Sequence, residues 1–187
     1  KGWAIGQPEI IRGIYEKLHI KKVINVYGIS EASPNVTTTR IDDPLDFRMA
    51  WHGKPHPETE IRIVDYTTGE PKAPLQSGEI CVRGWNVMQG YYKKPEETRE
   101  AIDKDGWLHT GDSGITDREG NLKFTGRIKD IIRVGGENVS AMEVENYLLT
   151  HPKVKNAAVI AVPDKRLTEV CMAVIQLKEG QQVTAEE

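Results

Sequence analysis

The segment from Gly126 to Glu145 constrains the fold of this chain more than any other. Ahead of it, apolar residues recur at every second position, which indicates strands; behind it they recur about every three to four positions, which indicates a helix. Glycine and charged residues, rather than apolar ones, crowd the point where the period changes. Because core packing alone does not account for such a composition, the segment predicts a boundary between two structural units.

The part before this boundary reads as a mixture of helices and strands. A proline in the first turn with an apolar stripe behind it predicts the first helix, and alternating apolar residues predict most of the strands. We expect helices at 8–18 and 95–102, strands at 23–26, 60–65, 78–83, 114–116 and 122–125, and a long polar loop at 33–57.

The part after the boundary reads as a small α+β unit. A strand at 131–134 leads into a Gly135-Gly136 turn, and Ser140-x-x-Glu143 is a capping box that begins a helix. We expect two further strands at 154–162 and 169–177, a loop at Pro163-Asp164, and another helix beginning near residue 183. This second unit looks unfinished at residue 187.

Composition excludes several classes of protein. The 187 residues suffice for one domain or for parts of two, and a net charge of −3 argues against a general nucleic-acid or membrane-surface binder. No apolar run approaches the roughly 18 residues of a transmembrane helix, and we expect no secretory signal because the residues from Lys1 do not form a charged and then apolar leader. Cys81 and Cys171 lie in apolar runs and are expected to be small buried hydrophobes in a reducing cytoplasm. The absence of an initial Met favours an internal piece of a longer protein.

Residues 27–31, Tyr-Gly-Ile-Ser-Glu, follow the expected buried strand at 23–26. Polar groups at the carboxyl end of a strand occupy a usual ligand position in α/β folds. Tyr27 is suited to stacking on a base, Ser30 to a phosphate, and Glu31 to Mg²⁺. The alternative is an ordinary loop, which five such common residues also fit.

Residues 105–112, Asp-Gly-Trp-Leu-His-Thr-Gly-Asp, are less easily explained as a plain turn, because Trp and His stand between two glycines. The Asp112 carboxylate is able to accept hydrogen bonds from both hydroxyls of a ribose. Alternatively, Asp112 caps a turn and His109 packs beside Trp107. Both readings remain open from the residues alone.

The boundary segment itself contains three further sets of candidate residues. Arg127 is suited to recognising ribose or phosphate with its rigid donor fork, or to a surface ion pair. Lys129 and Asp130 are also explained simply as solvated charges in a linker. Gly135-Gly136 is either a plain hairpin turn or a place where backbone approaches a ligand closely.

Together these pieces resemble the adenylate-forming enzyme superfamily, which includes acyl-CoA synthetases, firefly-type luciferases and peptide-synthetase adenylation domains. The resemblance implies a multidomain α/β and α+β fold. Residues 1–126 would be the C-terminal part of a large AMP-binding domain with a β-rich, distorted barrel-like subdomain, residues 127–130 a hinge, and residues 131–187 an incomplete small C-terminal domain. It also implies a two-step reaction, in which a carboxylate and ATP form an acyl-adenylate and pyrophosphate, and the CoA thiol then displaces AMP.

The resemblance also implies roles for individual residues. Tyr27, stacking on adenine, and Gly28 would belong to the ATP or AMP site, where Ser30 contacts the phosphate and Glu31 binds Mg²⁺. Asp112 and Arg127 would hold the ribose, and Lys129 would be the hinge that swings the small domain. On the CoA side, Gly135 and Gly136 would line the pantetheine tunnel, with Arg133 near CoA. The acyl pocket would be bordered by Ala32, Ser33 and the loop at His52-Gly53.

The chain departs from the family pattern in places. Ser30, Ala141 and Thr168 stand where Thr, Pro and Gly are usual, and Trp3-Ala4-Ile5 matches too roughly for a role. The family's phosphate loop should precede residue 1 and its C-terminal lysine should follow residue 187. We therefore expect these 187 residues alone not to adenylate a carboxylate.

The expected parent enzyme is an ATP-dependent acyl-CoA ligase for an aliphatic, fatty acid. Residues 135–138, Gly-Gly-Glu-Asn, and residues 87–92 are similar to the acyl-CoA synthetase branch. Its substrates would be a carboxylic acid, ATP and CoA. Two alternatives are a non-catalytic nucleotide-binding remnant and an adenylation enzyme with a different acyl acceptor.

Overall fold

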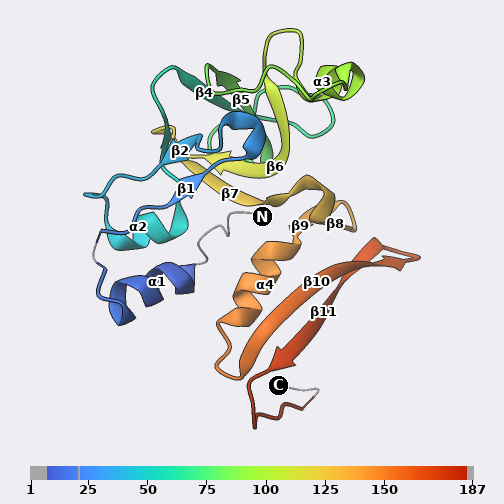
Figure 1. Cartoon of the computed structure of the whole chain (residues 1–187). Coiled ribbons are helices and arrows are strands. Elements are labelled where there is room, and N and C mark those ends of the chain that lie inside the picture. The colour runs from blue at the N-terminus through green and yellow to red at the C-terminus, as the bar shows by residue number, and fades with distance from the viewer. Residues whose placement is uncertain (1–7, 21, 185–187) are drawn as a thin grey trace. The chain divides into compact units, whose positions relative to one another are not determined.

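The computed structural model describes residues 8–20 and 22–184 (Figure 1). The chain divides into two compact units, Lys1–Phe124 and Thr125–Glu187, each of which is described by itself below. The expected match of Trp3-Ala4-Ile5 and the last residues of the helix expected from residue 183 lie outside the described residues. Residues 183 and 184 themselves are not helical.

The first unit begins with helix α1 (Pro8–Lys17), followed by a small antiparallel sheet in the order β1-β2-β3. Its strands β1 (Val26–Tyr27), β2 (Thr37–Thr38) and β3 (Lys54–Pro55) are two residues long. The 3-10 turn η1 (Ser30–Ala32) and helix α2 (Leu45–Ala50) complete this part. The expected strand at 23–26 is therefore confined to its last residue and Tyr27.

The prediction of a long polar loop at 33–57 was wrong, because this segment contains β2, α2 and β3. Its order depends on buried polar side chains that bind backbone. The Thr37 hydroxyl donates to the carbonyl of His52 at 2.7 Å, and the buried Arg48 donates through Nε to the carbonyl of Asp43 at 2.9 Å. Apolar periodicity carries no signal for such an arrangement.

The larger sheet of the first unit is an antiparallel meander in the order β4-β5-β6-β7. It consists of β4 (Thr59–Val64), β5 (Gly78–Gly84), β6 (Leu108–Thr116) and β7 (Leu122–Arg127), whose last three residues fall in the second unit. Buried aliphatic residues form its core: Ile63, Val64, Ile80, Val82 and Leu108. Among the described residues the sheet is open, with β4 and β7 as its edges, so the expected barrel-like subdomain is β-rich but does not form a closed barrel.

Helix α3 (Pro95–Ala101) confirms the prediction from its proline and acidic first turn. The strand expected at 114–116 is longer than predicted, because β6 begins at Leu108 and includes His109 and Asp112. The alternative that Asp112 caps a turn assumed that the strand had not yet begun at residue 112. The strand tolerates Gly111, whose φ is +67°, because it bulges at this point.

The second unit is a four-stranded antiparallel sheet in the order β10-β11-β8-β9 (Figure 1). After the 3-10 turn η2 (Ile128–Asp130) come β8 (Ile131–Val134), β9 (Glu137–Ser140), α4 (Ala141–Leu149), β10 (Val154–Asp164) and β11 (Thr168–Leu177). Helix α4 packs along β10, and the core contains Ile132, Ala141 and Val159. The mixed α/β and α+β fold class is thus confirmed.

Local signals in this unit were mostly interpreted correctly. Ser140 is the N-cap of α4 and accepts from the Glu143 amide at 3.2 Å, as the capping box predicts. Gly135 and Gly136, with φ of +60° and +94°, form the two-residue turn between β8 and β9. Strand β9 was not predicted, and the Pro163-Asp164 loop was wrong because both residues extend β10.

The two cysteines differ in burial. Cys81 is buried in β5, as predicted, whereas Cys171 in β11 is exposed, so the prediction for it was wrong. Several apolar residues of the same hairpin are also exposed, including Met172 and Val174. In this hairpin, an apolar run in the sequence therefore does not mean that its side chains are buried.

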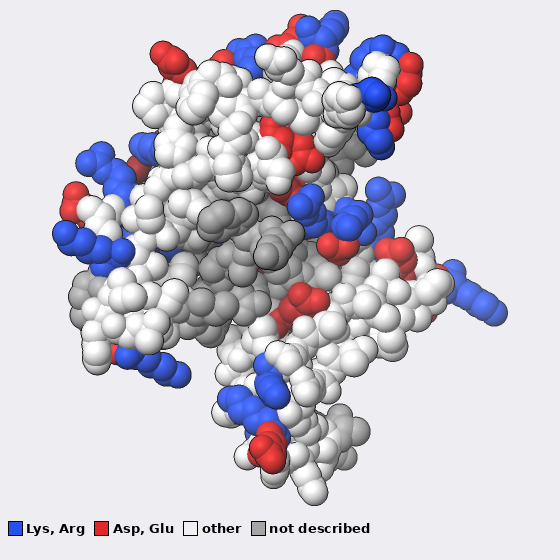
Figure 2. Space-filling model, viewed as in Figure 1, with Lys and Arg blue, Asp and Glu red and all other residues white. Residues whose placement is uncertain are grey.

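The surface carries charges of both signs. Figure 2 shows Lys and Arg mixed with Asp and Glu in small groups over the face drawn, which agrees with the net charge of −3. Among the described residues, the helices are too short or too polar to span a membrane.

Ser140 allows a test of the second unit. Its hydroxyl accepts from the Glu143 amide and donates to the Thr125 carbonyl at 2.6 Å. We expect Ser140→Ala to lower the free energy of unfolding by about 1–2 kcal/mol, as for other N-cap deletions. Urea unfolding monitored by far-UV circular dichroism measures the loss. Ser140→Thr keeps the hydroxyl and should retain most of the stability; equal midpoints for wild type and Ser140→Ala would contradict the role.

Candidate functional site

Tyr27 is the first residue of the site and stands at the end of β1. Its side chain is buried, and its ring stacks on Phe124 with the centroids 5.8 Å apart. Its hydroxyl donates a hydrogen bond of 2.8 Å to Oδ2 of Asp112, although the two residues are 85 positions apart. The structure therefore brings together two residues that the sequence analysis selected from separate motifs.

Asp112 lies in β6 with only 1% of its surface exposed. A buried carboxylate is costly unless hydrogen-bond donors surround it. The Tyr27 hydroxyl is one such donor, and the Asp112 amide is itself held by Thr110 Oγ1 at 3.1 Å. The carboxylate is thus fixed in place, and the reading of Asp112 as a mere turn cap is wrong because the residue is within a strand.

His52 also packs against Phe124, the residue on which the Tyr27 ring stacks. Its ring meets the Phe124 ring edge-on at 6.4 Å, and its Nδ1 accepts from the Phe124 amide at 3.2 Å. Burial, with a smaller effect of the Lys123 charge, lowers the pKa of His52 to about 4. The imidazole is therefore neutral at pH 7, with its proton on Nε2.

Ser30 and Glu31 lie in the 3-10 turn η1, directly after Tyr27 and Gly28. Oε1 of Glu31 accepts a hydrogen bond of 3.0 Å from the Tyr91 hydroxyl. Burial and this hydrogen bond raise the pKa of Tyr91, so the phenol remains a neutral donor. Ser30 is exposed, and half-buried Glu31 offers one carboxylate, which suits the way Mg²⁺ binds together with phosphate oxygens.

Gly28 makes a close backbone approach to the loop that follows. A Cβ placed on Gly28 would lie 1.5 Å from the carbonyl oxygen of Pro34. Any side chain there would displace residues 34 and 35 and, with them, the turn that carries Ser30 and Glu31. Glycine is therefore required at this position by packing, whatever ligand the turn binds.

The other predicted residues belong to the second unit. Arg127 ends β7, Lys129 lies in η2, and Arg133 lies in β8; all three side chains are exposed. The Arg133 amide donates to Oε2 of Glu169 at 2.7 Å. Gly135 and Gly136 form the tight turn described above, which confirms the hairpin and leaves their predicted ligand role as a prediction.

Sequence reasoning did not find two residues that shape the site. Phe124 supplies the ring on which Tyr27 packs, and Glu79 in β5 binds the β6 backbone next to Asp112, with Oε1 accepting from the Gly111 amide at 3.0 Å. Both occupy ordinary strand positions in the sequence. Only the pairing of the strands places them beside the motifs.

Comparisons with known proteins identify the family of this chain. The family pattern described as "AMP-binding enzyme" matches residues 4–92, and that of the "AMP-binding enzyme C-terminal domain" matches residues 143–187. The chain belongs to the AMP-binding, or adenylate-forming, enzyme family. The resemblance stated from the sequence is thereby confirmed.

Individual relatives and structures are similar over most of this chain. A mitochondrial medium-chain acyl-CoA ligase of Bos taurus is 41% identical, over 96% of this chain and 29% of its own length. The o-succinylbenzoate coenzyme A synthetase of Bacillus subtilis in complex with AMP is 33% identical with a TM-score of 0.83, over 100% of this chain and 37% of that one. An amide bond synthetase from Marinactinospora thermotolerans is 33% identical with a TM-score of 0.84, over 96% and 36%. The chain thus spans about a third of the length of the curated relatives it matches.

His52 provides a pH-dependent test of the packing beside the Tyr27–Asp112 pair. In the unfolded chain it protonates near its ordinary pKa of 6.5, but in the folded protein only near 4. Between these values the unfolded state binds more protons, so stability falls as the pH falls. This shift corresponds to a loss of about 3 kcal/mol between pH 7 and pH 4.

The measurement compares wild type with His52→Asn, whose side-chain oxygen replaces the Nδ1 acceptor and does not titrate. Urea unfolding at several pH values gives the stability difference between the two proteins. We expect the free energy of unfolding of wild type to fall, relative to that of His52→Asn, as the pH falls below about 6.5. A difference that stays constant from pH 7 to pH 4 would show that His52 is not held neutral.

Proposed function

We propose that the protein to which this chain belongs is an ATP-dependent acyl-CoA ligase. It would activate a carboxylic acid as an acyl-adenylate and transfer the acyl group to CoA, releasing AMP and pyrophosphate. The observation that carries the nucleotide half of this proposal is the buried Asp112 carboxylate, held by the Tyr27 hydroxyl at 2.8 Å. Family membership and the AMP-bound and acyl-CoA-forming relatives support it.

Asp112 would bind the ribose hydroxyls, together with Arg127. A carboxylate held in one position accepts both hydrogen bonds of a cis-diol without reorganising, which favours binding. Tyr27, whose hydroxyl is fixed by Asp112 and one face of whose ring packs on Phe124, would stack on adenine through its other face, which is buried in this structure and would be uncovered when the nucleotide binds. Recognition of the base and of the ribose would thus depend on one rigid pair of hydrogen-bonded residues, Tyr27 and Asp112.

Ser30 and Glu31 would act at the phosphates. Both stand on the short turn η1, so a hydroxyl donor and a carboxylate are presented close together. Glu31 would hold Mg²⁺, which neutralises phosphate charge when bound. The Tyr91 hydroxyl at 3.0 Å orients the Glu31 carboxylate.

The second unit would carry the acyl-transfer half-reaction. We propose the domain boundaries stated from the sequence, with the hinge at residues 127–130. Rotation about the backbone of Lys129, which lies in the one-turn segment η2, would move residues 131–187 between the two half-reactions. Gly135 and Gly136 lack side chains and would let the pantetheine arm pass, with Arg133 toward the CoA phosphates.

A fatty acid is the proposed acyl substrate, because the curated relative named above is a medium-chain acyl-CoA ligase. The acceptor is proposed as CoA, although similarity to an amide bond synthetase favours an amine as the second candidate. The proposed location is the cytoplasm, while that relative is named as mitochondrial. The remnant hypothesis predicts nucleotide binding without product.

The ribose assignment is tested by Asp112→Ala in the full-length protein. Removing charge-assisted hydrogen bonds of about 1.5–3 kcal/mol should weaken AMP binding about 10- to 100-fold, measured by isothermal titration calorimetry. Asp105→Ala, an exposed aspartate of the same motif, is the matched control and should bind normally. Unchanged affinity in a folded Asp112→Ala protein would remove Asp112 from the nucleotide site.

The complete reaction is tested with a panel of carboxylic acids and the full-length protein. We expect AMP and an acyl-CoA thioester to form in equal amounts, with medium-chain fatty acids among the best substrates. Omitting CoA should stop thioester formation and slow AMP release. AMP release with an amine acceptor and no thioester would favour amide synthesis, and nucleotide binding without any AMP formation would favour the remnant.

A further inference from the structure

Strand β6 carries a bulge at the point where Asp112 stands. Its register with β5 pairs Cys81 with His109 and Glu79 with Ser113. Ile80 alone therefore faces three residues, 110–112, and the ladder is interrupted there. A bulge re-aims the side chains that it contains and leaves backbone groups without their usual strand partners.

Side chains replace the interrupted ladder within this bulge. The Thr110 hydroxyl donates to the Ile80 carbonyl at 2.7 Å and accepts from the Asp112 amide at 3.1 Å. Oε1 of Glu79 accepts from the Gly111 amide at 3.0 Å. Thr110 and Glu79 thus hold the three-residue bulge, and the Glu79 side chain reaches it from the neighbouring strand β5.

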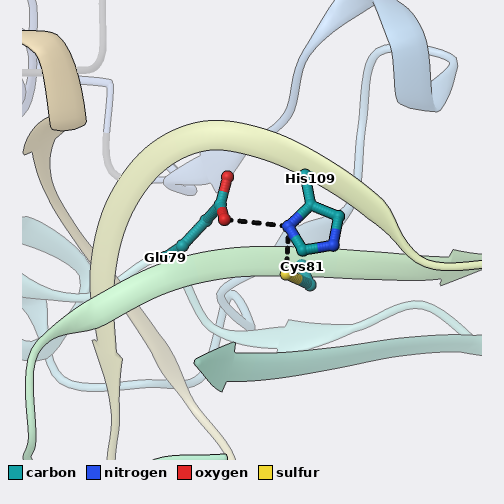
Figure 3. Close-up of side chains that lie close together, drawn as sticks. All are labelled: Glu79, Cys81 and His109. Carbon is teal, nitrogen blue, oxygen red and sulfur yellow. Dashed lines mark hydrogen bonds and ion pairs between the residues drawn. The ribbon is translucent and has the colours of Figure 1, made fainter. Parts of the chain in front are cut away.

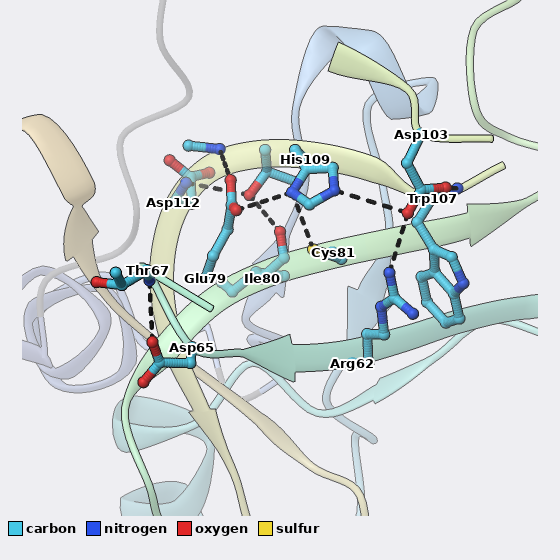
Figure 4. Close-up of polar contacts among 12 residues, drawn as sticks. Arg62, Asp65, Thr67, Glu79, Ile80, Cys81, Asp103, Trp107, His109 and Asp112 are labelled. Carbon is cyan, nitrogen blue, oxygen red and sulfur yellow. Dashed lines mark hydrogen bonds and ion pairs between the residues drawn. The ribbon is translucent and has the colours of Figure 1, made fainter. Parts of the chain in front are cut away.

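The second oxygen of Glu79 is also fixed. Oε2 lies 2.9 Å from Nδ1 of His109, whose Nε2 lies 3.7 Å from the Asp103 carboxylate (Figure 4). Asp103 in turn accepts from Arg62 at 3.1 Å, and the Arg62 guanidinium stacks on Trp107. This chain of contacts immobilises the Glu79 carboxylate at both oxygens.

We propose that Glu79 is a positioning residue for nucleotide binding. Through the Gly111 amide it holds the bulge that places the Asp112 carboxylate against ribose. This inference rests on the proposed nucleotide site. In this role Glu79 acts on the nucleotide through Asp112 and not by direct contact, so its effect should be specific to the part of the nucleotide that Asp112 recognises.

The same region offers a different interpretation as a metal centre. Glu79, Cys81 and His109 present one donor atom each, all within 4.8 Å of one another (Figure 3). A metal needs the thiolate of Cys81, but that side chain is fully buried, and burial raises its pKa to about 12. Since Gly111 and His109 already engage both oxygens of Glu79, we favour the positioning role.

The test measures the affinity of the full-length protein for AMP and for 2′,3′-dideoxyadenosine monophosphate, which lacks both ribose hydroxyls. We expect Glu79→Ala to weaken AMP binding about 10-fold and to leave the dideoxy nucleotide unaffected, as the loss of a charge-assisted contact at the ribose predicts. Glu79→Gln keeps the acceptor for Gly111 and should bind both ligands nearly as wild type does.

A matched control and a milder variant complete the design. Glu60→Ala removes another carboxylate of the same sheet, paired with Arg83 at 2.8 Å, and should change neither affinity. Glu79→Asp keeps the charge but is too short to reach Gly111. If Glu79→Ala does not fold, the loss of ribose discrimination should appear in Glu79→Asp.

Equal weakening of both nucleotides, or unchanged discrimination in folded Glu79→Ala and Glu79→Asp, would overturn the positioning role. Zinc bound by wild type in equilibrium dialysis and lost in Cys81→Ala would overturn it in favour of the metal centre. The variant Asp112→Ala distinguishes failure of the Glu79 positioning role from failure of the proposed nucleotide site. If it too leaves discrimination unchanged, the ribose assignment itself is wrong; if it abolishes discrimination while Glu79→Ala does not, only the positioning role fails.

Discussion

The hydrogen bond from the Tyr27 hydroxyl to the Asp112 carboxylate, at 2.8 Å, is the interaction on which the first unit depends. It joins the small sheet of β1–β3 to the bulge of β6, across 85 positions of sequence. A carboxylate with 1% exposure is tolerated only where donors are held in place. The surrounding structure serves this requirement: Phe124 backs the Tyr27 ring, and Glu79 anchors the bulge.

The elements that the sequence predicted well are those whose stability comes from apolar periodicity or from a local cap. Strand β5, helix α3 and the Ser140 cap of α4 belong to this class. Helix α2 and strand β2 do not, because their buried positions include Arg48 and Thr37, which bind backbone carbonyls instead of packing as apolar residues. Cys171 shows the converse, because it lies in an apolar run of the sequence and yet is exposed in strand β11.

For the site, motif reasoning selected Tyr27 and Asp112 but not the contact between them. The register of β6 explains why. Alternation along the strand gives no sign of a bulge in which one residue faces three, and the bulge alone brings the Gly111 amide to Glu79. Residues that act through strand pairing are therefore invisible to a linear pattern, even where the residue they position is obvious.

The two units solve different physical problems under the proposed function. Nucleotide recognition requires a carboxylate that does not move, and the first unit buries Asp112 to achieve this. Acyl transfer would require a change of conformation, and η2 suits it because the Lys129 side chain is exposed; rotation there would break the hydrogen bond from the Ile131 amide to the Ile128 carbonyl but no buried side-chain contact of Lys129. Rotation at Lys129 would therefore disturb little packing. A site that must stay rigid and a hinge that must turn are best built from opposite kinds of environment, and the sequence changes its pattern between them at Gly126.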